Sequence, residues 1–281
     1  MKYLTTLLLL FSSFAHAEQF QAPITDTQWL VESSPLACSM TQEIARFGRA
    51  QFTQLPGEEF TLTFSSSLYP SQKTNIYFEI AQAPWQNSED RLPLIALAAQ
   101  KGQHKFTLSG KLAKQAFTYI KEGMFPTIRY LSQNSNEDIS VLLSTVHFRD
   151  SNVNFSQCVE QLFPYTFEQI RKLTIHFNSE QSILTEDAKT ALIKIADYVK
   201  IDNSIRRITV AGHTDNYGRK RINIPLARAR AIAVKNFLVK ENELAEKLII
   251  ISWHREFIAA TTNKTTQGRS INRRTEIELI R

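Results

Sequence analysis

The stretch that decides the fold of the C-terminal part of the chain is RITVAGHTD, residues 207–215. It opens with three β-branched residues among its first four, which predicts a β-strand over residues 207–211. Gly212-His213-Thr214-Asp215 follows at once, and the next predicted element is a helix over residues 226–240 that carries Arg230. We therefore expect Asp215 at the end of a strand and Arg230 on the helix that follows it.

An aspartate and an arginine placed in this way can form the two halves of a clamp for a zwitterion. The carboxylate of Asp215 would take an ammonium group, and the guanidinium of Arg230 would take a carboxylate through a two-pronged charged hydrogen bond. The D-centre of diaminopimelate in the bacterial cell wall presents both groups, although spacing alone does not name that ligand. The alternative is that Asp215 and Arg230 simply pair with each other.

The rest of the C-terminal part predicts a small α/β sandwich. Thr185 precedes two acidic residues and an apolar pattern of helical period, so it is expected to cap a helix. Further strands are predicted at residues 172–177, 248–252 and 275–280. The resulting order, strand–helix–strand–helix–strand–strand (βαβαββ), is that of helices packed on one face of a sheet.

In the N-terminal part, apolar and polar residues alternate over short segments. This part is expected to be mainly antiparallel β, folded as a sandwich or barrel. Its predicted strands are residues 60–64, 75–80, 105–109, 126–131 and 139–148. One helix is expected at residues 111–122. A membrane barrel is the alternative, but it needs alternating segments of ~9–11 residues. The alternating segments in this chain are shorter than that.

The first 17 residues predict a secretory signal peptide. Lys2 is the charged start, residues 7–11 are apolar, and Ala15-His16-Ala17 is a small-x-small cleavage site. No later stretch is apolar over the ~20 residues of a membrane helix. We therefore expect an exported protein that is soluble or held by partners.

The chain has two cysteines, Cys38 and Cys158. In an exported protein two cysteines usually form one disulfide, and the alternative is two separate buried thiols. By the chain-entropy model, closing so long a loop stabilises the fold by roughly 5 kcal/mol. Such a bond would tie residues 18–164 into one domain and leave residues 165–281 as a second.

Composition and motifs argue against several classes of function. The formal charge is +6, but no long Lys/Arg block is present, so no nucleic-acid partner is expected. The chain has no His-Glu-x-x-His motif, and we expect no metal, no cofactor and no catalytic residue. His104 and His147 fall in expected strands, where a lone histidine is more often structural. Trp29 and Trp85 are expected in the core.

An ordered series of residues in the C-terminal part resembles the OmpA-like peptidoglycan-binding domain. The matching positions are Phe177, Leu184, Gly212-His213-Thr214-Asp215, Gly218, Asn223, Leu226, Arg230-Ala231, Gly268-Arg269 and Asn272-Arg273-Arg274. The resemblance covers residues 173–279 and implies the same α/β sandwich. It implies that Asp215 and Arg230 bind diaminopimelate in uncrosslinked stem peptides. It further implies that Asn223, Thr214 and Arg273 line the same pocket.

Three departures from the pattern of this family stand near the expected site. Ala227 replaces a usual serine, which could weaken a helix cap by ~1 kcal/mol. Ser252-Trp253-His254 replaces a usual Gly-x-Gly, and Ile258 stands near a usual proline. The last two departures are expected to reshape a loop beside the site, so the affinity for peptidoglycan need not be typical.

A second resemblance concerns the N-terminal part. Residues 29–38 and Arg46-Phe47-Gly48-Arg49-Ala50 are similar to the start of the mature chain in the MotY family of flagellar motor proteins. The resemblance implies a periplasmic ring with MotX around the basal body, in which the N-terminal half engages the ring and the stator. The C-terminal half would hold the wall. The alternative is another non-catalytic tether of the periplasm or outer membrane that binds peptidoglycan without a motor.

Overall fold

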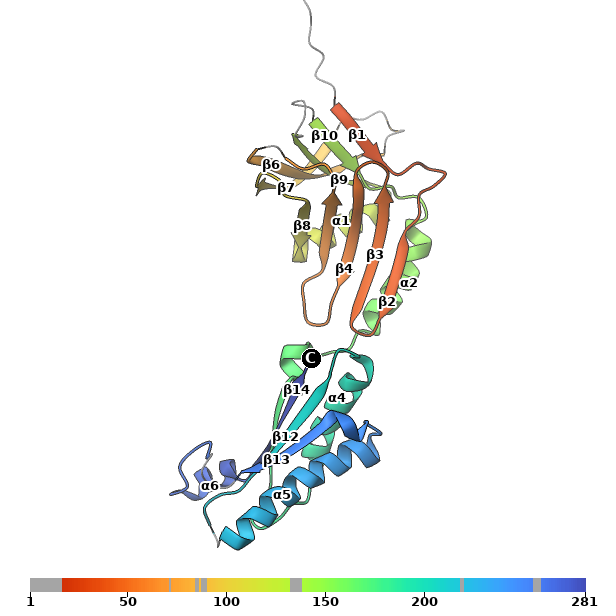
Figure 1. The fold of residues 1–281 in the computed structure, drawn as a ribbon. Coiled ribbons are helices and arrows are strands. Elements are labelled where there is room, and N and C mark those ends of the chain that lie inside the picture. Colours follow the sequence, from red (N-terminus) through yellow and green to blue (C-terminus); the bar gives the residue numbers. More distant parts are fainter. Residues whose placement is uncertain are drawn as a thin grey trace, which may run out of the picture. The chain divides into compact units, whose positions relative to one another are not determined.

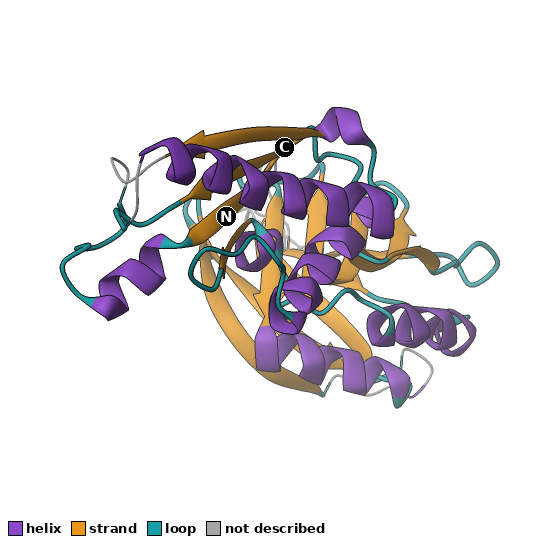
Figure 2. Cartoon of the chain, turned by 90° about the horizontal axis from the view of Figure 1, so that it is seen from below, coloured by secondary structure: helices purple, strands orange, loops and turns teal. Residues whose placement is uncertain are grey.

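The computed structural model describes residues 17–70, 72–83, 86, 90–131, 138–217, 220–254 and 259–281. The chain divides into two compact units, Met1–Leu162 and Phe163–Arg281, and both combine helices with strands (Figure 2). In the described ranges, no helix is long and apolar enough to cross a membrane. The expected signal peptide, apart from Ala17, lies outside the described residues, as do Trp85, Gly218 and Ile258.

The N-terminal unit contains two five-stranded sheets (Figure 1). In spatial order, the first sheet consists of β1 (Ala17–Gln21), β10 (Asp138–Leu142), β9 (Phe125–Leu131), β6 (Thr74–Ala81) and β7 (Arg91–Ala99). The second consists of β2 (Leu30–Ser34), β3 (Ala37–Ile44), β4 (Gly48–Gln54), β5 (Thr61–Ser66) and β8 (Lys105–Ser109). All neighbours are antiparallel except β1 and β10. The expected, mainly antiparallel architecture is confirmed.

Alternation along the strands builds the core of this unit. Met40, Phe52, Leu62 and Leu108 lie opposite one another across β3, β4, β5 and β8, and each is at most 2% exposed. Aromatic rings extend this row. The ring of Phe52 lies 5.0 Å from that of Phe117 and 6.0 Å from that of Trp29. Aromatic pairs at such distances contribute about 1 kcal/mol each beyond their burial.

Two helices complete the unit, and one of them corrects the sequence prediction. Helix α1 (Gly110–Lys121) lies within one residue of the expected position. The expected strand at 139–148, however, ends at Leu142, and Phe148 begins helix α2 (Phe148–Glu160). His147 has a left-handed backbone, φ 56°, which breaks the strand direction just before the helix. Neither His147 nor His104 lies in a strand, so that expectation was wrong.

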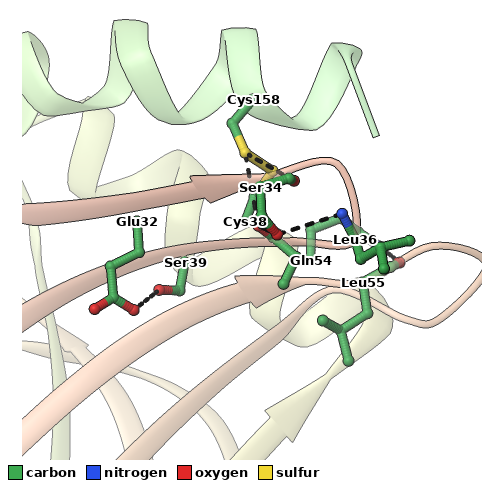
Figure 3. Close-up of a disulfide and its surroundings, with 9 residues drawn as sticks. Glu32, Ser34, Leu36, Cys38, Ser39, Gln54, Leu55 and Cys158 are labelled. Atoms are coloured by element: carbon green, nitrogen blue, oxygen red, sulfur yellow. Dashed lines mark hydrogen bonds between the residues drawn. A yellow bond between two sulfur atoms is a disulfide. The ribbon is translucent and has the colours of Figure 1, made fainter. Parts of the chain in front are cut away.

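The two cysteines form the expected disulfide. Cys38 on β3 is bonded to Cys158 on α2, with a Cα–Cα distance of 5.9 Å (Figure 3). Cys38 is 0% and Cys158 6% exposed, so the bond is shielded from solvent. It fixes α2 to the second sheet at a point 120 residues away in sequence.

The C-terminal unit has one four-stranded sheet in the order β11-β14-β12-β13. Its elements are α3 (Phe167–Ile170), β11 (Lys172–His176), α4 (Glu186–Ile201), β12 (Arg207–His213), α5 (Lys220–Asn236), a π-helical turn (Phe237–Glu241), a 3-10 turn (Glu246–Leu248), β13 (Ile249–His254), α6 (Thr266–Asn272) and β14 (Arg274–Ile280). The expected order of strands and long helices is confirmed, with the short helix α6 added before the last strand. Thr185 caps α4 as expected, since its side chain accepts a hydrogen bond from the N–H of Ala188.

Helix α5 differs most from its prediction in this unit. It was expected to start at Leu226, but it starts at Lys220 and contains Pro225. Helix α5 packs on β12 and β13, and its π-helical continuation contacts α4, which packs on β11. These helices cover the sheet face that buries Ile208, Val210 and Ile277.

Candidate functional site

The end of β12 places Asp215 at the entrance to the loop that leads into α5. Its side chain is 9% exposed. Oδ2 accepts a hydrogen bond from Arg273 Nη1 at 3.0 Å, which is also an ion pair, and Oδ1 accepts one from the backbone N–H of Tyr217 at 3.1 Å. These two donors hold the carboxylate in one orientation.

Arg230 is carried by α5 and is 0% exposed. Nε donates to the carbonyl of Gln181 at 3.0 Å, Nη1 to that of His213 at 2.8 Å and Nη2 to that of Asn178 at 3.2 Å. Its guanidinium carbon also lies 5.2 Å from the ring centre of Phe177. Arg230 therefore joins the end of β12 to the segment that follows β11.

Burial sets the electrostatics of Arg230. Desolvation lowers the pKa of its guanidinium to about 10, with the nearby charge of Asp215 opposing this shift and that of Arg273 adding to it. Of the two arginines, Arg273 is the one that forms the ion pair with Asp215. Asp215 and Arg230 therefore do not form a simple pair. Together with Arg273 they form a cluster of two cations and one anion.

The position of α5 depends on a close approach to β12. The backbone of α5 at Ala227 lies so near Gly212 that a Cβ on Gly212 would collide with the carbonyl oxygen of Ala227. Glycine therefore allows the helix to lie against the strand end, and this places Arg230 beside His213.

Asn223 and Thr214 were expected to line the same pocket. Asn223 is 4% exposed, and its Nδ2 donates to the backbone carbonyl of Asp215 at 3.2 Å. This bond ties the loop after β12 to helix α5. Thr214 is 2% exposed, and its Oγ1 has no hydrogen-bond partner among the described residues. The structure thus places all five expected residues around the junction of β12, α5 and the start of β14.

Arg273 connects this junction to a cleft along β11. Its Nε donates to the carbonyl of Phe177 at 3.2 Å while its Nη1 contacts Asp215. The cleft has a volume of about 530 Å³ and is lined by β11, the start of α4 and the end of α6, with Phe177, Asn178 and Arg273 at the end nearest the cluster. A ligand held by the cluster could extend into this cleft.

The departures from the OmpA-like pattern have structural consequences. Ala227 is 0% exposed and lies well inside α5, so it is not a cap, and the expected loss of a cap was wrong. Ser252-Trp253-His254 continues β13, paired with residues 211–213, and does not form a loop. The ring of Trp253 is 5.2 Å from the guanidinium of Arg228, and Ile258 lies outside the described residues.

Sequence reasoning missed the residues that act through their backbones. The carbonyls of Asn178, Gln181 and His213 hold Arg230. No side-chain pattern reveals such contacts, because every residue has a carbonyl. Asn272, which belongs to the matched motif, is 0% exposed and its Oδ1 accepts hydrogen bonds from the N–H groups of Ala260 and Thr261. It organises the loop before α6.

Comparison with known proteins agrees with this architecture. Residues 20–164 match the MotY N-terminal domain, and residues 176–273 match the OmpA family. The chain is 28% identical over 270 residues to the sodium-type flagellar protein MotY of Vibrio parahaemolyticus, covering 94% of this chain and 91% of that protein. It is 33% identical over 103 residues to the peptidoglycan-binding protein ArfA of Mycobacterium bovis, covering 37% of this chain and 31% of that protein.

Among solved structures, the C-terminal domain of Helicobacter pylori MotB is similar, with a TM-score of 0.36 and 21% identity, covering 39% of this chain and 84% of that one. The two family matches describe a protein with a MotY-type N-terminal domain, which is rich in β-strands here, and a C-terminal domain that matches the OmpA family. The chain belongs to the MotY family.

Proposed function

We propose that this chain is a non-catalytic component of a flagellar motor in the Gram-negative periplasm. Its C-terminal unit would bind peptidoglycan, and its N-terminal unit would associate with the ring of the basal body, with MotX and with the stator. The full-length similarity to a sodium-type flagellar protein supports the motor assignment. The similarity of the C-terminal unit to a peptidoglycan-binding protein supports the wall assignment.

The observation that carries the wall-binding proposal is the cluster of Asp215, Arg273 and Arg230. Its net charge of one positive unit favours a ligand that brings a carboxylate, while Asp215 can accept an ammonium group. Arg230 uses three of its five N–H donors on backbone carbonyls and is 0% exposed, so Arg273, whose side chain is 16% exposed, is the more accessible guanidinium for a ligand. The D-centre of diaminopimelate supplies both charges, because its ammonium and carboxylate groups are bonded to the same carbon atom.

The buried hydroxyl of Thr214 adds a neutral polar group to the same place. A hydroxyl without a partner costs free energy in a buried site, and a ligand that hydrogen-bonds to it would recover that cost. We therefore propose that Asp215 binds the ammonium group and that the two arginines bind the carboxylate. Thr214 and Asn223 would hold these groups in position.

A stator must resist torque, and a covalent wall offers a fixed support for it.

The experiment that tests the proposal is co-sedimentation of the purified mature protein with isolated sacculi. Asp215→Ala should reduce binding by about 30-fold or more, because loss of one member of a buried charge pair costs ~2–5 kcal/mol of affinity. Asp197→Ala is the matched control, since Asp197 is exposed on α4. Equal pelleting of wild type and Asp215→Ala would refute the assigned site.

A further inference from the structure

Strand β7 forms an open edge of the first sheet in the N-terminal unit. The sheet order ends at β7, which pairs only with β6 in the described part of the chain. The strand is nine residues long, and residues 92–99 carry no charged side chain. Leu92 is 42% exposed, and Ala96 and Ala98 are also exposed.

An edge of this kind presents a row of backbone N–H and C=O groups to any extended chain. Proteins usually guard such edges with lysine, proline or a bulge. In β7 such features lie in the first half of the strand. Pro93 has no backbone N–H to donate, and the pairing with β6 shifts register opposite Phe78 and Glu79 of β6. The second half, residues 95–99, follows the shift in register and has neither a proline nor a charge.

A hollow lies directly beside the unguarded half of β7. It has a volume of about 250 Å³ and lies between β6 and β7 of the first sheet and β8, which is an edge strand of the second sheet. Its apolar lining comes from Ile76, Phe78, Leu97 and Phe106. The hollow therefore offers a pocket for an apolar side chain next to an open strand edge, which is the combination used in strand addition.

The charge around this edge specifies the partner further. Residues 91–109, from the start of β7 to the end of β8, contain three Lys or Arg and no Asp or Glu. Lys105 lines the hollow, and Lys101 follows the end of β7 by two residues; both side chains are exposed. A second copy of β7 complements this charge poorly, because residues 91–99 carry no acidic side chain to lie near Lys105.

We propose that the outer edge of β7 is the docking site for an extended segment of a partner protein. The segment pairs with residues 95–99 as an added strand and places an apolar side chain in the hollow beside Leu97. Acidic side chains of the same segment lie near Lys101 and Lys105. Backbone hydrogen bonds give this contact its affinity, and the hollow and the lysines give it specificity.

The test is photo-crosslinking in the living cell with the full chain carrying a benzophenone amino acid at Ala96. The matched control position is Thr63, which faces outward on β5 but has a strand on each side. We expect an adduct at Ala96 at least 10-fold stronger than at Thr63. Mass spectrometry of the adduct should identify a peptide with alternating apolar residues flanked by Asp or Glu.

Charge reversal provides the second measurement. Lys101→Glu with Lys105→Glu should reduce the adduct at Ala96 at least 10-fold, while Lys101→Arg with Lys105→Arg should leave it unchanged. The absence of an adduct, an adduct to a second copy of this chain, or an adduct insensitive to charge reversal would each overturn the proposal. Sacculus binding should be the same in both variants, so the outcome is independent of the wall-binding proposal.

Discussion

At the scale of single residues, Arg230 shows how one side chain can serve both fold and function. It is 0% exposed, and its three hydrogen bonds join segments on either side of the site, around Asn178 and His213. A guanidinium in this position holds the end of β12 and the segment after β11 together even before any ligand binds. Asp215, in contrast, is held by Arg273 and a single backbone N–H.

This difference predicts that the two residues respond differently to truncation. Arg230→Ala should destabilise the C-terminal unit by about 3 kcal/mol, because it leaves three buried carbonyls without their donor. Urea unfolding of the full chain would measure the change. Arg228→Ala is the control, since Arg228 lies on the same helix but is exposed. An unchanged unfolding midpoint for Arg230→Ala would contradict the structural role.

At the scale of elements, local patterns identified the strands and helices whose side chains alternate cleanly. Strand β8 was predicted at its observed bounds, and α1 and β12 within two residues. Helix α2 was missed because the apolar residues from Ile139 onward continue past the end of β10, and a short apolar run does not distinguish a strand from a helix. The burial of Phe148 and Phe155 against the second sheet favours the helix.

The disulfide acts at this scale, since it joins α2 to β3. Replacing both Cys38 and Cys158 by serine should lower the stability of the N-terminal unit by as much as roughly 5 kcal/mol, because the unfolded chain regains the freedom of a long loop. Calorimetry of the mature protein should show the N-terminal transition moving to lower temperature. The C-terminal transition serves as the internal control, and an equal shift of both would argue against two independent units.

At the scale of the whole molecule, the proposed function links a wall-binding unit to a unit that meets the motor. Deleting the gene should leave cells with flagella that do not rotate, because stators without a fixed support deliver no torque. Microscopy of swimming and of flagellar filaments would measure both properties. Reintroducing the chain with Asp197→Ala should restore swimming, and Asp215→Ala should not. Normal swimming of the deletion strain would favour a periplasmic tether without a motor role.

The alternating strands, the cap at Thr185, the cysteine pair and the set of residues around Asp215 could all be predicted from the sequence. The strands and the cap depend on neighbours in the chain, the cysteine pair on there being two cysteines in an exported chain, and the residues around Asp215 on a matched motif. The sequence did not predict that Arg273 pairs with Asp215 or that Arg230 binds carbonyls, which depend on the folded chain. The physical reason is the sheet order β11-β14-β12-β13, which brings the start of the last strand beside a loop 58 residues earlier. Spacing along the chain does not encode that neighbourhood.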